Sequence, residues 1–471
     1  MSLSEVEVGH SRIEQVMATV RRQIDSQQIA PGSKLASIRA QAQRLGVSKS
    51  TVVEAYDRLV AHGEISARRG SGFYAAGHLP PLSLVPDDRH AQRDVDPVWM
   101  TRRSLDQDEA LLKPGCGWLP ASWMPEADIA KAMRALARQD GIGLADYATP
   151  HGLPALRQLL SRRMAERAIE APPQQIMLTE SGTQAVDLIC RFFLKPGDTV
   201  LLDDPCYFNF HAMLRAHRVN TVSVAYTQTG PDVGQLETVL QEHPVRLYIT
   251  NSALHNPTGA SLSPVVAHRV LKLAEQHDVL IIEDDIFADF EHELSPRLAA
   301  FDGLDRVIHI GSFSKTLSAA VRCGYIAARK DWIEALVDLK LATSFGGGAF
   351  SADLVFRLLS DGAYRRHMNA VKGRLSDARG RVSAKLRSLG VVHTIEPKAG
   401  MFLWCQLPDG LDAASVARHA LALGVVLAPG QAFSLNEGSA SFLRFNVTQS
   451  LDQATFVALE RAMQQALSLR G

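Results

Sequence analysis

Long apolar runs are missing from this sequence. The most apolar strand-like stretch, residues 279–282, stops at Glu283, whereas a membrane helix needs roughly 20 apolar residues. Residues 1–10 contain no apolar segment like that of a secretory signal peptide. These absences exclude an ordinary membrane or exported protein, and we expect a soluble one.

Paired cysteines are missing as well. The five cysteines are an odd number, and no two of them have the CxxC spacing of a metal site. Isolated thiols of this kind are typical of a reducing compartment. We therefore expect a cytoplasmic protein that has neither structural disulfides nor a bound metal. These cysteines are Cys116, Cys190, Cys206, Cys323 and Cys405.

Charge is unevenly distributed although the chain of 471 residues has no net charge. Residues 10–76 contain ten Lys/Arg against five Asp/Glu, a net charge of +5, so the remainder carries −5. A chain of this length is too long for one ordinary core, and two or more domains are expected. The asymmetry indicates that a small N-terminal domain meets a polyanion.

The N-terminal segment predicts three helices followed by a hairpin. Ser37 and Ser48 are suited to cap the second and third helices, and Gly46 suits the tight turn between them. A Gly-rich turn at residues 69–72 separates two short β-like runs. The first helix is predicted from apolar residues spaced i, i+3, i+4 and i+7, namely Ile13, Val16, Met17, Val20 and Ile24.

Short polar side chains begin the third predicted helix. In a helix-turn-helix, residues at this position reach the base edges of the major groove. The candidates for base contact are Ser48, Lys49, Ser50 and Thr51. The candidates for phosphate or minor-groove contact are Arg39, Arg58, Arg68 and Arg69. The alternative is a small helical domain with a solvated basic face.

This segment as a whole resembles the GntR family of winged helix-turn-helix repressors. The resemblance covers, almost without gaps, PGSKLASIRAQAQRLGVSKSTVVEAYDRLVAHGEISARRGSGFY. It departs from the family at Ala36, where a proline usually precedes the serine. The resemblance implies that residues 10–76 form a DNA-binding domain whose partner is a double-stranded operator.

Beyond a linker predicted at residues 77–108, the pattern changes to alternating strands and helices. As a flexible coil the linker would span on the order of 30 Å. Helical patterns at 128–139, 153–167 and 184–193 alternate with β-rich runs, which predicts a mostly parallel α/β sheet. The β-rich runs are 175–178, 199–202, 221–224, 247–250, 280–283 and 307–311. A long charged helix near residue 362 begins a mixed α and β segment, which predicts a smaller second subdomain.

Residues that could react with or bind a ligand follow these predicted strands. Lys315 lies in Gly-Ser-Phe-Ser-Lys-Thr after a buried strand, and a lysine forms a Schiff base with an aldehyde cofactor only when it is partly desolvated. The turn at residues 181–184 precedes a helix whose N-terminal amides favour phosphate. Tyr207 could stack on a flat heterocycle, and Asn256 lies in an Asn-Pro-Thr-Gly turn. Asp284 ends an apolar strand, where a buried carboxylate requires a cationic partner.

Taken in order, these features resemble fold-type-I pyridoxal-phosphate (PLP) enzymes of the aminotransferase class over roughly residues 110–460. The resemblance implies a body at residues 109–471, with a large domain at about 145–355 and a small α+β domain made of about 109–144 plus 356–471. It implies that Lys315 holds PLP as a Schiff base and that Asp284 pairs with the pyridine nitrogen. Tyr207 would stack on the ring, and Asn256 would bond the phenolic oxygen.

The same resemblance assigns the remaining site residues. Arg444 would grip the carboxylate of a substrate or effector through a bidentate pair, and Tyr147 would reach the phosphate of a neighbouring subunit. Asp285 would be structural. The residues that would hold or flank the phosphate are Ser181, Gly182, Thr183, Gln184, Ser312, Ser314 and Arg322.

One departure concerns the phenolic oxygen of the cofactor. The family usually has a tyrosine three residues after the aspartate, and this position is Phe287. Loss of a hydrogen bond to a charged group is typically worth ~1.5–3 kcal/mol. We expect PLP to bind through its other contacts, with weakened catalysis.

A GntR-type DNA-binding domain joined to an aminotransferase-like domain is typical of the MocR subfamily of regulators, and the chain resembles that subfamily over its whole length. The resemblance implies a homodimeric, PLP-dependent transcriptional regulator that senses an amine, an amino acid or PLP itself. Two alternatives stay open. The chain could be an active aminotransferase of amino acids with an accessory DNA-binding module, or a repressor whose body only dimerises.

Overall fold

The computed structural model describes residues 11–25, 29, 32–68, 71–76, 102, 104–105, 110–138 and 146–468. These residues belong to two units, a small N-terminal unit and a large unit that contains the rest. The predicted linker lies almost wholly outside the described residues. Each unit is described separately below.

The N-terminal unit consists of three helices and a hairpin, which confirms the sequence prediction. The helices are α1 (Arg12–Asp25), α2 (Ile38–Leu45) and α3 (Lys49–Ala61), and β1 (Ile65–Arg68) pairs antiparallel with β2 (Gly72–Ala75). Ser37 and Ser48 cap α2 and α3 by accepting the amides of Ala40 and Thr51, and Gly46 adopts a left-handed φ of 62° between the helices. The core joins all three helices to the hairpin. Its buried members include Val16, Val20, Ala42, Val52, Tyr56, Leu59 and Ile65.

An eight-stranded sheet forms the centre of the large unit, with the order β3-β10-β9-β8-β7-β4-β5-β6. The strands are β3 (Ile176–Thr179), β4 (Thr199–Asp204), β5 (Asn220–Thr227), β6 (Gly230–Pro231), β7 (Val245–Thr250), β8 (Leu280–Asp284), β9 (Val307–Ser312) and β10 (Gly324–Ala327). The five inner strands from β9 to β5 pair in parallel, as predicted. Two strands were missed. β10 pairs antiparallel with β3 and β9, and β6 pairs antiparallel with β5.

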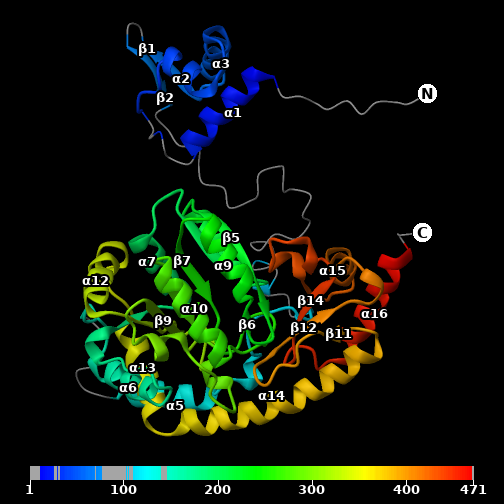
Figure 1. Cartoon of the computed structure of the whole chain (residues 1–471). Helices are drawn as coiled ribbons and strands as arrows, with labels where there is room; N and C mark the ends of the chain where they lie inside the picture. Colours follow the sequence, from blue (N-terminus) through cyan, green and yellow to red (C-terminus); the bar gives the residue numbers. More distant parts are fainter. Residues whose placement is uncertain are drawn as a thin grey trace. The chain divides into compact units, whose positions relative to one another are not determined.

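Helices cover both faces of this sheet (Figure 1). One core contains side chains of α7 (Gly182–Phe193), α8 (Phe208–Ala216) and α12 (Lys330–Ser344). The core of the other face contains side chains of α6 (Pro154–Ala165), α9 (Val233–Glu242) and α10 (Pro264–Gln276). Because both faces are covered, β4 and β9 are buried along their whole length and β8 is buried beyond its first residue, and these strands read as apolar runs in the sequence. The other helices of this part are α5 (Glu126–Ala137), α11 (Leu298–Asp302) and α13 (Ala349–Ser360).

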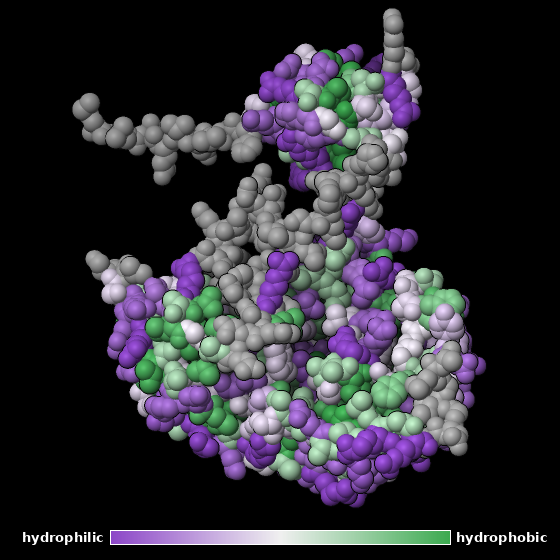
Figure 2. Space-filling model, turned by 180° about the vertical axis from the view of Figure 1, so that it is seen from behind, coloured by the Kyte–Doolittle hydropathy of each residue, from purple (hydrophilic) through white to green (hydrophobic). Residues whose placement is uncertain are grey.

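The C-terminal part of the large unit has its own antiparallel sheet of order β11-β12-β14-β13. The strands are β11 (Val392–His393), β12 (Phe402–Gln406), β13 (Ala428–Pro429) and β14 (Phe442–Asn446), and α15 (Ala413–Ala422) and α16 (Gln453–Ser468) accompany them. The predicted charged helix is α14 (Ala363–Ser388), which leads from the central sheet to this smaller one (Figure 1). Seen from behind, the lower right part of the large unit is predominantly hydrophilic (Figure 2).

An early segment of the chain joins the smaller sheet. Leu112 forms a bridge with Val425, and the amide of Gly115 donates to the carbonyl of Val426 over 3.0 Å. The amide of Asn446 donates to the carbonyl of Pro114 over 2.7 Å. All five cysteines are buried and unpaired. Within the described part of the chain, none of the helices has the length and apolarity that a membrane crossing requires.

Candidate functional site

A cavity of about 250 Å³ lies where several strands of the central sheet end. Residues that follow β3, β4, β7, β8 and β9 line it, because the carboxyl ends of parallel strands open on one edge of a sheet. Of the predicted site residues, the cavity brings together Ser181, Gly182, Thr183, Tyr207, Asn256, Asp284, Phe287, Ser312, Ser314, Lys315 and Arg322.

Lys315 follows β9 and presents its amine to this cavity. Burial lowers the pKa of the amine to about 8; the Cys116 thiol works in the opposite direction and the nearby Arg444 cation in the same direction. The Nζ atom lies 5.9 Å from the centre of the Trp118 ring. At pH 7.5 a lysine with this pKa is about one quarter neutral, whereas an ordinary lysine is almost fully charged. The amine is therefore prepared to act as a nucleophile.

Asp284, the last residue of β8, is the only one of three consecutive carboxylates that lines the cavity. Burial raises the pKa of this carboxyl to about 6, against the hydrogen bond from the amide of Ile286. Among the described residues no ion pair neutralises it. A cationic ligand in the cavity would supply the missing partner.

The two neighbouring carboxylates have protein partners instead. Glu283 accepts hydrogen bonds from the amides of Leu298 and Ala299, over 2.6 and 2.9 Å. Asp285 forms a buried ion pair with Arg297, with an Oδ1–Nη2 distance of 3.2 Å. Alternation along a strand sends neighbouring side chains to opposite faces. The contacts of Asp285 agree with the structural role expected of it.

The N-terminus of α7 forms another wall of the cavity. Ser181 caps the helix by accepting the amide of Gln184, and Gly182 and Thr183 line the cavity. Opposite them, the hydroxyls of Ser312 and Ser314 lie 3.0 Å apart. Arg322 is exposed and lines the same cavity, so hydroxyls, helix amides and a guanidinium all border it. This is the chemistry of an anion site.

Gln184 does not take the predicted position. Its side-chain Oε1 accepts the backbone amide of Glu180 over 2.7 Å, and the residue does not line the cavity. The prediction assumed that all four residues of the turn face the phosphate. Instead, the side chain of Gln184, the fourth residue of the turn, points back toward the backbone amide of Glu180.

Arg444, on β14, reaches the cavity through Asn256. Its Nη1 donates to Asn256 Oδ1 over 2.8 Å, and its Nη2 donates to the carbonyl of Gly115 over 2.7 Å. The side chain is 1% exposed, and its Nε has no hydrogen-bond partner among the described residues. Burial lowers the pKa of Arg444 to about 10. A buried guanidinium with an unused donor and no carboxylate partner is suited to bind a ligand carboxylate.

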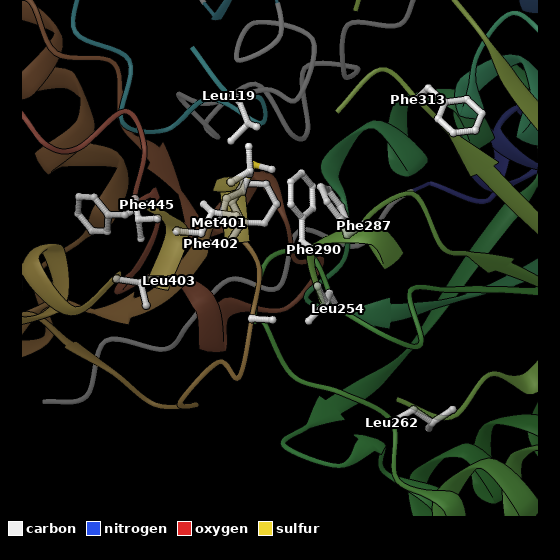
Figure 3. Packing of buried hydrophobic residues seen from close by; sticks show 14 of the residues in the cluster. Leu119, Leu254, Leu262, Phe287, Phe290, Phe313, Met401, Phe402, Leu403 and Phe445 are labelled. Atoms are coloured by element: carbon white, nitrogen blue, oxygen red, sulfur yellow. The ribbon is translucent and has the colours of Figure 1, made fainter. Parts of the chain in front are cut away.

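Aromatic rings border the cavity at Tyr207 and Phe287. Tyr207 precedes α8 and packs against Phe208, with ring centres 5.0 Å apart. Phe287 is 4% exposed and packs edge to face on Phe402 of β12, with ring centres 5.4 Å apart. Figure 3 shows Phe287 and Phe290 beside each other among the buried side chains. Phe287 lines the cavity beside Asp284, as the sequence predicted, and its ring has no hydroxyl to donate.

Sequence reasoning missed the residues that precede the large domain. Gly117 and Trp118 line the cavity, and the buried thiol of Cys116 lies beside Lys315 and Arg444. The only signal for them was the small-residue segment around Gly115. Tyr147 is not part of this cavity. It is 81% exposed and contacts Phe345, with ring centres 4.9 Å apart.

The candidate DNA contacts lie on exposed positions of the N-terminal unit. Ser48, Lys49 and Ser50 are exposed at the start of α3, where Thr51 is partly exposed, and Arg39 is exposed at the start of α2. Arg58 is engaged in an ion pair with Glu54 at 2.9 Å. The guanidinium of Arg68 lies over the Tyr74 ring at 4.2 Å. Arg69 lies outside the described residues.

Residues 121–460 match the family described as aminotransferase class I and II. The chain belongs to the aminotransferase class I and II family. Residues 12–75 match the bacterial regulatory proteins of the gntR family. The two matches together confirm the predicted combination of the MocR subfamily.

Known relatives of this aminotransferase-family chain include both regulators and enzymes. YdcR of Escherichia coli K12, named as an uncharacterized HTH-type transcriptional regulator, is 30% identical over 445 residues, which cover 92% of this chain and 94% of YdcR. Aromatic-amino-acid aminotransferase 1 of Thermococcus litoralis is 30% identical over 347 residues, 70% of this chain and 82% of the enzyme. The crystal structure of LysN from Thermus thermophilus is that of an alpha-aminoadipate aminotransferase complexed with N-(5'-phosphopyridoxyl)-L-leucine. It matches with a TM-score of 0.72 and 26% identity over 81% of this chain and 98% of LysN.

The cofactor of this aminotransferase fold is PLP, and the cavity fits it. The anion site at the start of α7 suits a phosphate, and Asp284 suits a protonated pyridine nitrogen. The amine of Lys315 suits the aldehyde. The uncompensated charge of Asp284 and the unused Nε of Arg444 are the structural observations that favour a bound polar group.

Proposed function

We propose that this chain is a PLP-dependent, DNA-binding transcriptional regulator whose aminotransferase-like unit senses an amino compound. The observation that carries the proposal is that Lys315, Asp284 and the Asn256–Arg444 pair meet at one cavity, on a chain whose N-terminal unit has a capped, exposed recognition helix. YdcR, a regulator by name, is similar over both units.

The cavity supports recognition of a ligand with an amine and a carboxylate. PLP supplies an aldehyde carbon that exchanges reversibly between primary amines. Lys315 is the resident amine, and its lowered pKa keeps part of it neutral near physiological pH. Asp284 holds negative charge at the inner end of the cavity, and Arg444 offers Nε and its planar donors to a carboxylate.

Asn256 connects the residues that would recognise the amine of the ligand with Arg444, which would recognise its carboxylate. Its Oδ1 is occupied by Arg444, so its side-chain amide group remains to donate toward the cavity. A carboxylate that competes for Arg444 would release Asn256 Oδ1 and change the contacts of both residues. A ligand shifts a conformational equilibrium only through such differential contacts. PLP itself, acting as a signal of vitamin status, is the simpler effector.

A footprint of DNA upstream of the chain's own gene tests this proposal. The full chain loaded with PLP should protect a site, and amino acids should change the protection. The Lys49→Ala variant should lose protection while keeping the visible absorbance of bound PLP. The Lys315→Ala variant should lose that absorbance and the response to amino acids. A Lys315→Ala footprint that responds like wild type would refute the sensing role.

The second candidate function is transamination of amino acids with a 2-oxo acid acceptor. The complete set of Lys315, Asp284, Asn256 and Arg444 favours it, as does the likeness to aromatic-amino-acid aminotransferase 1. Phe287 weakens it, because the cavity lacks the hydroxyl that usually serves the phenolic oxygen. Conversion of a 2-oxo acid to its amino acid over many turnovers, with an amino acid as donor, would support the enzyme.

We also propose a homodimer located in the cytoplasm. Tyr147 and Phe345 are exposed aromatic residues that touch each other, and exposed apolar contact pairs mark interaction surfaces. The role of Tyr147 at a partner's phosphate rests on the family resemblance. Sedimentation of wild type tests the homodimer, and a PLP titration of Tyr147→Ser followed by visible absorbance tests the role of Tyr147, since the variant should lose PLP affinity without unfolding.

A further inference from the structure

The helix α14 has an unusual charge for a unit that is acidic overall. Its 26 residues contain eight Lys/Arg and one carboxylate, Asp377. Residues outside 10–76 carry a net charge of −5. The strong positive charge of α14 therefore contrasts with the net negative charge of this part of the chain. Sequence composition alone assigned polyanion contact to the N-terminal segment and concealed this surface.

The cations form two rows along the helix. Arg365, Lys372 and Arg379 are spaced seven residues apart, which places them along one side. Arg374 and Arg381, also seven apart, and Lys385, four residues further, lie along the other side. The buried face between the rows packs on the body through residues that include Leu375, Ala378, Val382 and Leu386.

Most of these cations are available to a partner. Arg365, Arg366, Arg381, Lys385 and Arg387 are exposed. Two others have contacts on the body, since Arg374 lies 3.9 Å over the Trp123 ring and Arg379 donates to the carbonyls of Lys398 and Gly400. Within the described part of the chain, no ion pair joins any of the eight to a carboxylate.

The solvent-facing side of α14, opposite its buried face, also lies between the two rows and is open to close approach. Gly373 and Gly380 lie seven residues apart, in line with Arg366, and a Cβ at either glycine would meet nothing within 4 Å. Glycine in an exposed helix interior lowers helix stability relative to alanine. Two of them at this spacing leave a low surface between two rows of positive charge, and the exposed carboxylate of Asp377 is the one negative charge of the helix on this strip.

The hollow beside the end of the helix extends this surface. Arg381 and Lys385 line it together with Gln453, the first residue of α16. The first turn of a helix favours an anion. The nearest carboxylate there, Asp452, accepts the amide of Ala454 at the start of the same helix.

We propose that this face of α14 binds the phosphate backbone of double-stranded DNA. At 1.5 Å per residue the helix is about 39 Å long, comparable with one turn of DNA at about 34 Å. Lysine and arginine rows contact phosphates without reading sequence. The inference rests on the proposed DNA binding by the N-terminal unit, which makes DNA the polyanion that this chain meets.

The salt dependence of DNA binding tests the inference with the full, PLP-loaded chain. The probe is the upstream duplex, and the logarithm of the observed binding constant is followed against the logarithm of salt concentration. The test variant is R366Q/R381Q/K385Q. The matched control is R246Q/R269Q/K330Q, which removes three exposed cations outside α14. Thermal melting and the visible absorbance of bound PLP establish that both variants are folded.

We expect the test variant to reduce the magnitude of the salt slope by about 2–3, since each phosphate contact contributes roughly 0.9. The control should keep the wild-type slope. A test variant that also keeps the wild-type slope overturns the inference. If it keeps that slope but loses binding to phosphatidylserine vesicles, the face belongs to an anionic membrane surface and the inference is equally overturned. Absence of DNA binding by wild type would instead refute the proposed function.

Discussion

Replacing Phe287 by tyrosine should restore a hydrogen bond that the cavity of this chain lacks. The ring lines the cavity beside Asp284 and Asn256 and is held on its other side by Phe402 and Phe290. A hydroxyl that donates to the phenolic oxygen of PLP stabilises negative charge on that oxygen. It therefore lowers the pKa of the protonated nitrogen that joins Lys315 to the cofactor.

The size of the effect follows from the energy of such a bond. A hydrogen bond to a charged group is worth about 1.5–3 kcal/mol, and one pKa unit corresponds to about 1.4 kcal/mol. We therefore expect Phe287→Tyr to lower the pKa seen in the visible absorbance of bound PLP by about 1–2 units. The assay is a pH titration of that absorbance in wild type and variant.

Phe290→Tyr is the matched control for this substitution. Phe290 is buried and packs against Phe287, with ring centres 6.4 Å apart, but it does not line the cavity. Its new hydroxyl should be left without a partner, which costs about 1–3 kcal/mol of stability, and the titration should stay unchanged. Identical titrations of wild type and Phe287→Tyr, with a loss of stability in the latter, would refute the reasoning.

Three further predictions concern charges and caps. Asp284→Asn should stabilise the PLP-free protein by up to about 3 kcal/mol at pH 7.5 and by almost nothing near pH 4. The reason is that the folded-state pKa of about 6 exceeds the ordinary value of 3.8, so the cost of burying the ionised carboxylate accumulates as the pH rises between these two values. Urea unfolding at both pH values measures the difference in stability, and a difference that does not depend on pH would contradict the prediction. Asp285→Ala should cost about 1.5–3 kcal/mol, since it removes a charged hydrogen-bond partner of the buried Arg297 but leaves Glu291 as its remaining carboxylate, whereas removal of the exposed partner of Arg329 by Asp331→Ala should not move the urea midpoint. Ser48→Ala should cost about 1 kcal/mol of local stability in α3, because Ser48 caps it. Amide hydrogen exchange in the full chain should then be faster in the first turn of α3, while Lys49→Ala, which changes the neighbouring exposed side chain, should not speed it.

Much of the site could be predicted because its chemistry is carried by short segments that follow strands. Asp284 ends a buried strand, and Tyr207, Asn256 and Lys315 follow buried strands within six residues; parallel strands bring such ends together. The roles of the adjacent carboxylates Asp284 and Asp285 could be separated only in part. The family resemblance implied different roles for Asp284 and Asp285, but the partner of Asp285, Arg297, lies twelve residues away and carries no local signal.

Other parts were not predictable because they depend on contacts between distant segments. The strand β10, four residues long, has no alternation of its own and is defined by pairing with β3 and β9 on either side. Gln184 belongs to the phosphate turn in sequence, but the helix geometry turns its side chain back to the amide of Glu180. Trp118 and Cys116 reach Lys315 from a segment far earlier in the chain.

The amino-acid sequence by itself determined the two-unit organisation, the mostly parallel sheet and the candidate lysine, because periodicity, capping residues and strand-end motifs are local properties. Only the tertiary structure decided which partners Glu283 and Asp285 have, that Arg444 is held by Asn256 with its Nε unused, and that the cations of α14 form two rows along its surface. These outcomes depend on burial and on pairs of residues far apart in the chain, and neither has a signature within a short window of sequence.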